Sequence, residues 1–190
     1  MKRAAVQECI ILGIDPGTTV LGYGLILVKN TSMRMITAGC IKLNKYDDHA
    51  TRLKCIYDRL TLLIDEYHPD EMSIEAPFFG KNVQSMLKLG RAQGVAIAAA
   101  LSRDIPYVEY APRRIKKAIT GNGGAAKEQV AAMLQAILKA DKLPTELDAT
   151  DGLAAAVCHE YSKNNSGATG AKSNKNWDSF LKNNADRIIP

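Results

Sequence analysis

Four acidic side chains are the residues of this chain best placed to do chemistry. Asp15 ends an apolar run and precedes the turn at residues 16–19, and Glu75 closes a second short apolar run. Asp148 and Asp151 are three positions apart, which places both on one face of a helix. Because clustered anions repel one another, the physical reason to gather them is a hard divalent cation with oxygen ligands. The pattern predicts a magnesium site.

Two of these acids also have structural explanations. Asp15 could cap the turn that follows it, and Asp148 could complete a capping arrangement that begins at Thr145. Capping does not require Asp151 as well, and two acids on one face of an alanine-rich helix would pack poorly in a core. The metal role is therefore favoured. The residues around Asp15 also resemble the first phosphate loop of the actin and sugar-kinase superfamily, whose members need two such domains and a longer chain.

The elements that must position the acids can be predicted from hydrophobic periodicity and turn residues. Strands are expected at 9–14, 21–28, 33–43, 71–75 and 107–110, and helices at 49–67, 82–102, 112–119, 126–140 and 147–161. The first three strands are joined by short turns, which predicts an antiparallel meander. The later alternation of helices and strands predicts an α/β fold, a five-stranded mixed sheet with helices on both faces. Ligands bind at the carboxyl ends of strands in such sheets, where the acids of the strand ends would meet the helical pair.

Length and composition limit the remaining possibilities. The chain has 190 residues, and we expect one folded domain over residues 1–161 followed by a polar, basic and flexible tail over 162–190. The four cysteines lack Cys-x-x-Cys spacing and are interpreted as buried free thiols, and the three histidines do not have metal-ligand spacing. No apolar stretch is long enough to span a bilayer, and the N-terminus lacks a cleavable signal, so a cytoplasmic protein without membrane partners is expected.

Positive charge is concentrated in the middle of the chain. The net charge is +5, and basic side chains far outnumber acidic ones between residues 81 and 127. A basic surface beside an acidic metal site suits a phosphodiester substrate, although charge alone favours a solvated helix face equally well. Phe78 and Phe79 follow Glu75 in a predicted loop, where one of them could stack on an unpaired base. The glycine-rich segment 121–127 is either a phosphate cradle or an ordinary connection.

Taken together, these residues resemble the RuvC family of Holliday junction resolvases, which belongs to the RNase H and retroviral-integrase superfamily. The matching stretches are 11–24, 52–54, 74–82, 87–96, 109–111, 116, 127 and 148–154. They occur in order and extend over most of the chain, but they exclude residues 1–8 and the tail from residue 162. The resemblance implies an RNase H-like fold.

The resemblance also implies roles for individual residues. The catalytic metal-binding acids would be Asp15, Glu75, Asp148 and Asp151, with Lys116 as a further catalytic residue. The DNA-binding residues would be Phe78, Lys81, Asn82, Arg113, Lys116 and Lys127. Pro77 and Gly80 could alter the aromatic loop, so Phe79 remains an alternative to Phe78. The cofactor would be Mg²⁺, two ions per active site, for which Mn²⁺ can substitute.

The function implied by the resemblance is a structure-specific endonuclease that resolves four-way DNA junctions by paired symmetric nicks in recombination and repair. It would act as a homodimer, with a branch-migration helicase complex as partner. The candidate interface is the helix at 82–102, because its alanine-rich stretch 94–101 is small and apolar nearly all round. The alternative is that this stretch is simply buried between the sheet and neighbouring helices. Two alternatives stay open from the residues alone. One is an RNase H-like nuclease on RNA–DNA hybrids, and the other is a non-catalytic protein that binds junctions.

Overall fold

The computed structural model describes residues 8–77 and 82–166 of the 190-residue chain. The predictions made for Phe78, Phe79 and Lys81 and for tail residues 167–190 lie outside these described residues. The predicted order of strands and helices is confirmed, and most element ends agree with the predicted ends within two residues.

The sheet has the predicted five strands in the order β3-β2-β1-β4-β5. Strands β1 (Glu8–Asp15), β2 (Val20–Lys29) and β3 (Ser32–Lys42) form the antiparallel meander. Strand β4 (Glu71–Glu75) then pairs parallel to β1, and β5 (Tyr107–Tyr110) pairs parallel to β4. Because β1 and β4 run in the same direction, their C-terminal acids, Asp15 and Glu75, lie at the same end of the sheet.

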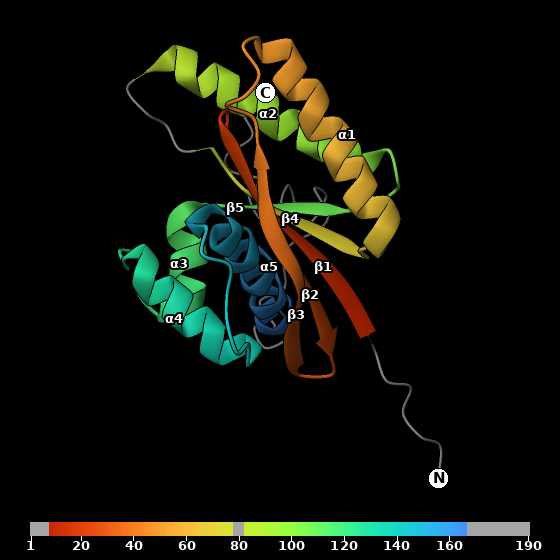
Figure 1. The fold of residues 1–190 in the computed structure, drawn as a ribbon. Coiled ribbons are helices and arrows are strands. Elements are labelled where there is room, and N and C mark those ends of the chain that lie inside the picture. The colour runs from red at the N-terminus through yellow and green to blue at the C-terminus, as the bar shows by residue number, and fades with distance from the viewer. Residues whose placement is uncertain (1–7, 78–81, 167–190) are drawn as a thin grey trace, which may run out of the picture.

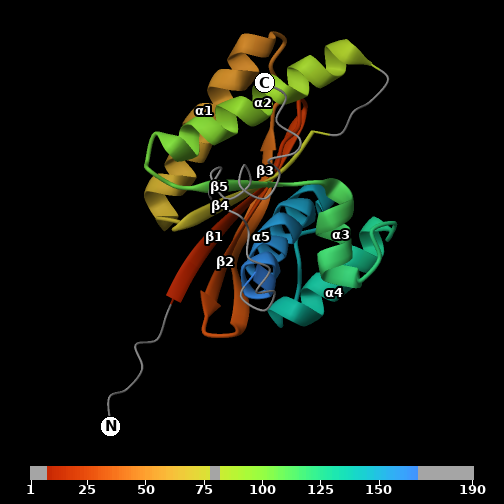
Figure 2. The ribbon, with the colours of Figure 1, turned by 180° about the vertical axis from the view of Figure 1, so that it is seen from behind.

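The helices cover both faces of the sheet, as predicted (Figure 1). Helices α1 (His49–Tyr67) and α2 (Val83–Leu101) pack on one face, and α3 (Pro112–Thr120), α4 (Lys127–Leu138) and α5 (Leu147–Ser166) lie on the other, which the reverse view also shows (Figure 2). Each layer has its own apolar core, one on each side of the sheet. Such a three-layer arrangement is the usual solution for an α/β chain.

The last helix is longer than predicted, since α5 ends at Ser166 rather than at Tyr161. Polar contacts hold this final part of the helix instead of apolar ones. The Lys163 ammonium lies 2.7 Å from the Glu71 carboxylate, and the Asn164 amide donates to Glu160 at 2.8 Å. Hydrophobic periodicity could not predict this extension because no apolar side chain marks it.

The four cysteines are free thiols, as predicted, but only Cys158 is fully buried and the other three are half-buried. None of the helices within residues 8–77 and 82–166 combines the length and the apolar character that crossing a bilayer requires.

Candidate active site

Close contact between α5 and the sheet positions two of the predicted acids. A Cβ atom on Gly22 would lie 1.8 Å from the backbone oxygen of Asp148, and one on Gly13 would lie 2.1 Å from that of Gly152. At these two glycines the helix backbone therefore lies directly against β1 and β2. Gly22 is also the register partner of Asp15 across the β1–β2 pair. The same glycine thus brings the start of α5 next to the end of β1.

The turn that follows Asp15 is anchored from α1. The guanidinium group of Arg52 donates to the carbonyl oxygen of Thr18 at 3.1 Å and to that of Tyr46 at 2.8 Å. Two backbone N–H groups, those of Leu43 and Asn44, donate to the Thr19 oxygen at 2.8 and 3.1 Å. These bonds fix the path of the chain immediately after the acid.

The structure brings the predicted acids together. Carboxylate oxygens of Asp15, Asp148 and Asp151 all lie within 4.8 Å of one another, and all three side chains are half-buried. Glu75 ends the strand beside β1, one position after the paired residues Ile14 and Ile74. Its charge acts on Asp15, which makes it a neighbour of the three-carboxylate group. Carboxylate oxygens are the donors that hard divalent cations prefer, so this donor set fits such an ion.

The electrostatics of the group agree with a cation site. Burial raises the pKa of Asp15 to about 8, with further contributions from the charges of Glu75 and Asp151. Burial likewise raises the pKa of Glu75 to about 7, and the charge of Asp151 adds to the effect. Without a cation, these two carboxyl groups hold protons at pH values where exposed carboxyl groups are ionised. A bound cation would supply the missing positive charge.

Both lysines of the site make contacts within the protein that the sequence did not indicate. The Lys127 ammonium donates to the Asp151 carboxylate at 2.5 Å, and this hydrogen bond raises the pKa of Lys127. Lys116 donates to the backbone oxygen of Ala125 at 3.0 Å, and its charge lowers the pKa of Glu75, against the larger effect of burial. Lys127, predicted as a DNA contact, therefore contacts the acidic group directly, whereas Lys116 also braces the loop before α4.

Of the other predicted DNA-binding residues, Asn82 and Arg113 belong to the described residues, and Phe78 and Lys81 do not. Asn82 is the N-cap of α2, where its side-chain oxygen accepts a hydrogen bond from the Ser85 N–H at 3.1 Å. This role has a sequence signal, because asparagine before a helical pattern is a preferred N-cap. Arg113 is exposed on α3. Phe78 and Lys81 belong to the segment that is not described.

Comparison with known proteins identifies the family. The family model described as "Crossover junction endodeoxyribonuclease RuvC" matches residues 11–159. A protein of that name from Christiangramia forsetii is 62% identical over 188 residues, which covers 98% of this chain and 96% of that protein. The chain belongs to the RuvC family. The RuvC match contains all four acids and both lysines, and the resemblance inferred from the motifs is confirmed.

Solved RuvC structures agree with this identification. The Thermus thermophilus RuvC structure has a TM-score of 0.75 and 29% identity, covering 83% of this chain and 96% of that chain. The same RuvC in complex with Holliday junction substrate has a TM-score of 0.74 and 28% identity, covering 82% and 95%. The predicted RNase H-like α/β fold is thereby confirmed.

The glycine contact yields a first prediction. Gly22→Ala is expected to weaken Mn²⁺ binding at least about tenfold and to cost about 1–3 kcal/mol of stability, because the new methyl group overlaps the Asp148 backbone. Titration calorimetry and thermal melting measure the two effects. Gly90→Ala is the control, since a Cβ there meets nothing within 4 Å. Unchanged Mn²⁺ affinity in Gly22→Ala would show that this contact does not set the position of the α5 acids.

Proposed function

We propose that this chain is a divalent-metal-dependent endonuclease that resolves four-way DNA junctions by paired symmetric nicks in recombination and repair. The single observation that carries the proposal is the cluster of carboxylates from Asp15, Asp148 and Asp151, with Glu75 beside it, in a chain of the RuvC family. Substrate choice is supported by the related T. thermophilus RuvC, which was solved with a Holliday junction. The function requires access to the chromosome, so we assign the protein to the cytoplasm.

In this proposal the four acids hold Mg²⁺, two ions per site, and Mn²⁺ can substitute. When bound, such ions would polarise the scissile phosphate and lower the pKa of a bound water molecule, so that hydroxide is available near neutral pH. The half-buried carboxylates would hold the ions at the carboxyl ends of β1 and β4. Lys127 balances the charge of Asp151, and Lys116 adds positive charge near Glu75. Positive charge placed there stabilises the negative charge that develops on the phosphate during hydrolysis.

We also propose that the active form is a homodimer that works with a branch-migration helicase complex. A four-way junction has approximate two-fold symmetry, and a dimer supplies one active site for each of two opposed strands. Helix α2 is the candidate interface. Ala96, Ala99 and Ala100 are buried in the protein's own core, whereas Val83 and Leu87 are 65% and 51% exposed. The exposed apolar side chains, rather than the alanines, are therefore the candidates for contacting a second copy.

The function is tested with three labelled nucleic acids. A four-way junction, a matched duplex and an RNA–DNA hybrid are each incubated with the protein, with and without Mg²⁺. The expected result is two symmetric nicks in the junction alone, only with the metal ion present, by a protein that light scattering shows to be a dimer. Cleavage of the hybrid would favour an RNase H-like nuclease, and junction binding without nicks would favour a non-catalytic protein.

The contact of Lys127 with Asp151 leads to a second prediction. Lys127→Ala is expected to tighten Mn²⁺ binding to the DNA-free protein several-fold, because the lysine competes with the ion for that carboxylate. Junction binding should weaken, with a shallower dependence on salt, as expected for a lost phosphate contact. Titration calorimetry and binding assays at several salt concentrations measure both. Lys117→Ala, at an exposed position of α3, is the matched control for charge. Equal Mn²⁺ affinities in both variants would contradict the competition.

A further inference from the structure

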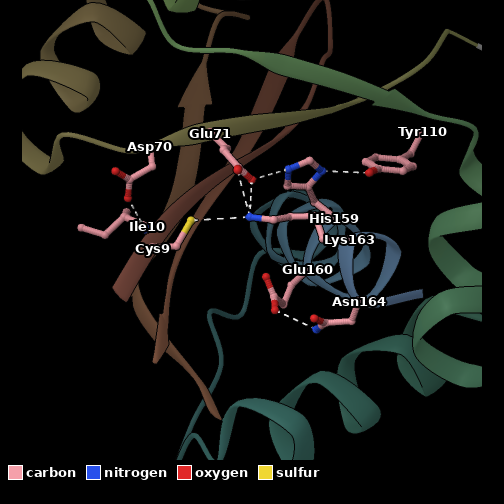
Figure 3. Close-up of polar contacts among 9 residues, drawn as sticks. All are labelled: Cys9, Ile10, Asp70, Glu71, Tyr110, His159, Glu160, Lys163 and Asn164. Carbon is pink, nitrogen blue, oxygen red and sulfur yellow. Dashed lines mark hydrogen bonds and ion pairs between the residues drawn. The ribbon is translucent and has the colours of Figure 1, made fainter. Parts of the chain in front are cut away.

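A partly buried chain of polar side chains joins α5 to the first residue of β4 (Figure 3). Glu71 is the first residue of β4, and one of its carboxylate oxygens lies 2.7 Å from Nε2 of His159. The other ring nitrogen of His159, Nδ1, lies 2.8 Å from the Tyr110 hydroxyl. The Lys163 ammonium donates to both carboxylate oxygens of Glu71, at 2.9 and 2.7 Å. His159 and Tyr110 are only 5% and 4% exposed.

The chemistry of the partners fixes the direction of these hydrogen bonds. An ionised carboxylate only accepts, so His159 donates from Nε2 to Glu71. In the neutral ring Nδ1 then accepts the proton of the Tyr110 hydroxyl. Burial pushes the pKa of Glu71 upward, but the hydrogen bonds from Lys163 and His159 outweigh it and hold the pKa below its ordinary value. Glu71 therefore stays ionised and keeps both donors.

These hydrogen-bonded side chains connect β4 and α5, the two elements that carry three of the four acids. Strand β4 begins with Glu71 and ends with Glu75. Helix α5 carries the two aspartates near its start and His159 further along the same helix. Tyr110 is the register partner of Glu75, and its carbonyl oxygen accepts from the Ala76 N–H at 2.9 Å. His159 is therefore linked to β4 at its first residue and, through Tyr110, beside its last.

Packing alone would hold α5 less exactly along its axis. Where α5 meets β1 and β2, Gly152 and Ala156 lie against Gly13, and the side chain of Leu153 lies against Gly24. Burial of apolar surface is favourable but not directional, and the glycine contacts limit mainly how closely the start of α5 approaches the sheet. Hydrogen bonds in a buried network are directional, and a shift would leave a buried donor or acceptor unpaired. The polar chain thus specifies one axial position of α5.

We propose that Glu71, His159 and Tyr110 are positioning residues that set the spacing between Glu75 and the aspartates of α5, and so the metal affinity of the site. None of the three is one of the four carboxylates assigned to the cation, so they act through the positions of β4 and α5. The kinetic part of this inference rests on the proposed function, whereas the metal-binding part does not.

The test compares two variants of the full-length protein. Tyr110→Phe removes one hydroxyl group and keeps the aromatic ring over which the Arg114 guanidinium lies at 5.0 Å. Glu71→Ala removes the carboxylate that joins His159 and Lys163. Both are expected to weaken Mn²⁺ binding to the DNA-free protein by about tenfold, the lower end of what outer-shell partners contribute. Electron paramagnetic resonance of free Mn²⁺ measures this affinity, and circular dichroism verifies that each variant is folded.

Asp70→Ala is the matched control. Asp70 precedes Glu71, and its carboxylate accepts from the Ile10 N–H at 2.7 Å, so it ties the same end of the sheet to β1 and not to α5. This variant should lose thermal stability while keeping the Mn²⁺ affinity of the wild type. Glu71→Gln should recover part of the affinity lost in Glu71→Ala, because its amide oxygen still accepts from His159.

The outcomes separate positioning from general stability. If Tyr110→Phe and Glu71→Ala melt earlier but bind Mn²⁺ as the wild type does, the inference is wrong. If Glu71→Ala does not fold, Tyr110→Phe decides the question by itself. On junction DNA the variants should lower kcat and leave KM unchanged at subsaturating Mn²⁺. A wild-type protein that nicks no junction would overturn the proposed function, but weaker Mn²⁺ binding in the two variants would still support the positioning role.

Discussion

Asp15→Asn is expected to lower the rate of junction nicking at least about a thousandfold, while junction affinity changes less than about threefold. The asparagine side chain keeps the shape of aspartate and removes the negative charge. A carboxylate oxygen of Asp15 lies within 4.8 Å of carboxylate oxygens of Asp148 and Asp151, so the substitution removes one charged ligand of the proposed cation site. Junction affinity should survive because phosphate contacts come from basic side chains and not from this carboxylate.

Two further variants and a control complete this experiment. Glu75→Gln and Asp151→Asn should have the same effect as Asp15→Asn, since each removes a carboxylate of the same group. Asp47→Asn neutralises an exposed aspartate outside the group and should nick at the wild-type rate. Single-turnover cleavage and gel-shift binding on one labelled junction measure rate and affinity separately. Wild-type turnover in any of the three variants would remove that residue from the proposed site.

The second large effect concerns the metal-free protein and pH. The folded-state pKa of Asp15 is raised from 3.8 to about 8, and that of Glu75 from 4.5 to about 7. The folded protein therefore keeps protons that the unfolded chain has released. The contribution of these groups to stability is fully present below about pH 4 and is lost as the pH rises toward 8. We expect the metal-free Tm to fall by at least about 5 °C between pH 5.5 and 8.5.

Metal ions should reverse this loss. A cation that binds only the folded state stabilises it by about 2.7 kcal/mol at one hundred times its Kd. Because a bound Mg²⁺ would displace the retained protons, its effect on Tm should be larger at pH 8.5 than at pH 5.5. Differential scanning calorimetry of wild type and Asp15→Asn in parallel isolates the contribution of this residue. A difference between the two proteins that does not vary with pH would contradict a raised pKa at Asp15.

The sequence by itself determined the order of the elements and the identity of the acids. Apolar periodicity and turn residues act within a short stretch of chain, so β4 at Glu71–Glu75 and α1 at His49–Tyr67 could be predicted with the ends that the structure shows. The spacing of Asp148 and Asp151 is also local, since a helix places residues three apart on one face. The longer α5 was missed because its last turn is held by Lys163 and Asn164 through polar contacts.

Only the tertiary structure decided which distant residues touch. Gly22 admits the backbone of Asp148, Lys127 pairs with Asp151, and Glu71 reaches His159, each across a large separation in sequence. Such contacts depend on how α4, α5 and the sheet pack, and a single sequence carries no local signal for them. His159 had no metal-ligand spacing in the sequence. Only the folded structure shows that it lies between the carboxylate of Glu71 and the hydroxyl group of Tyr110. Residue types and local spacing named the chemistry, and packing between layers set the distances at which it can occur.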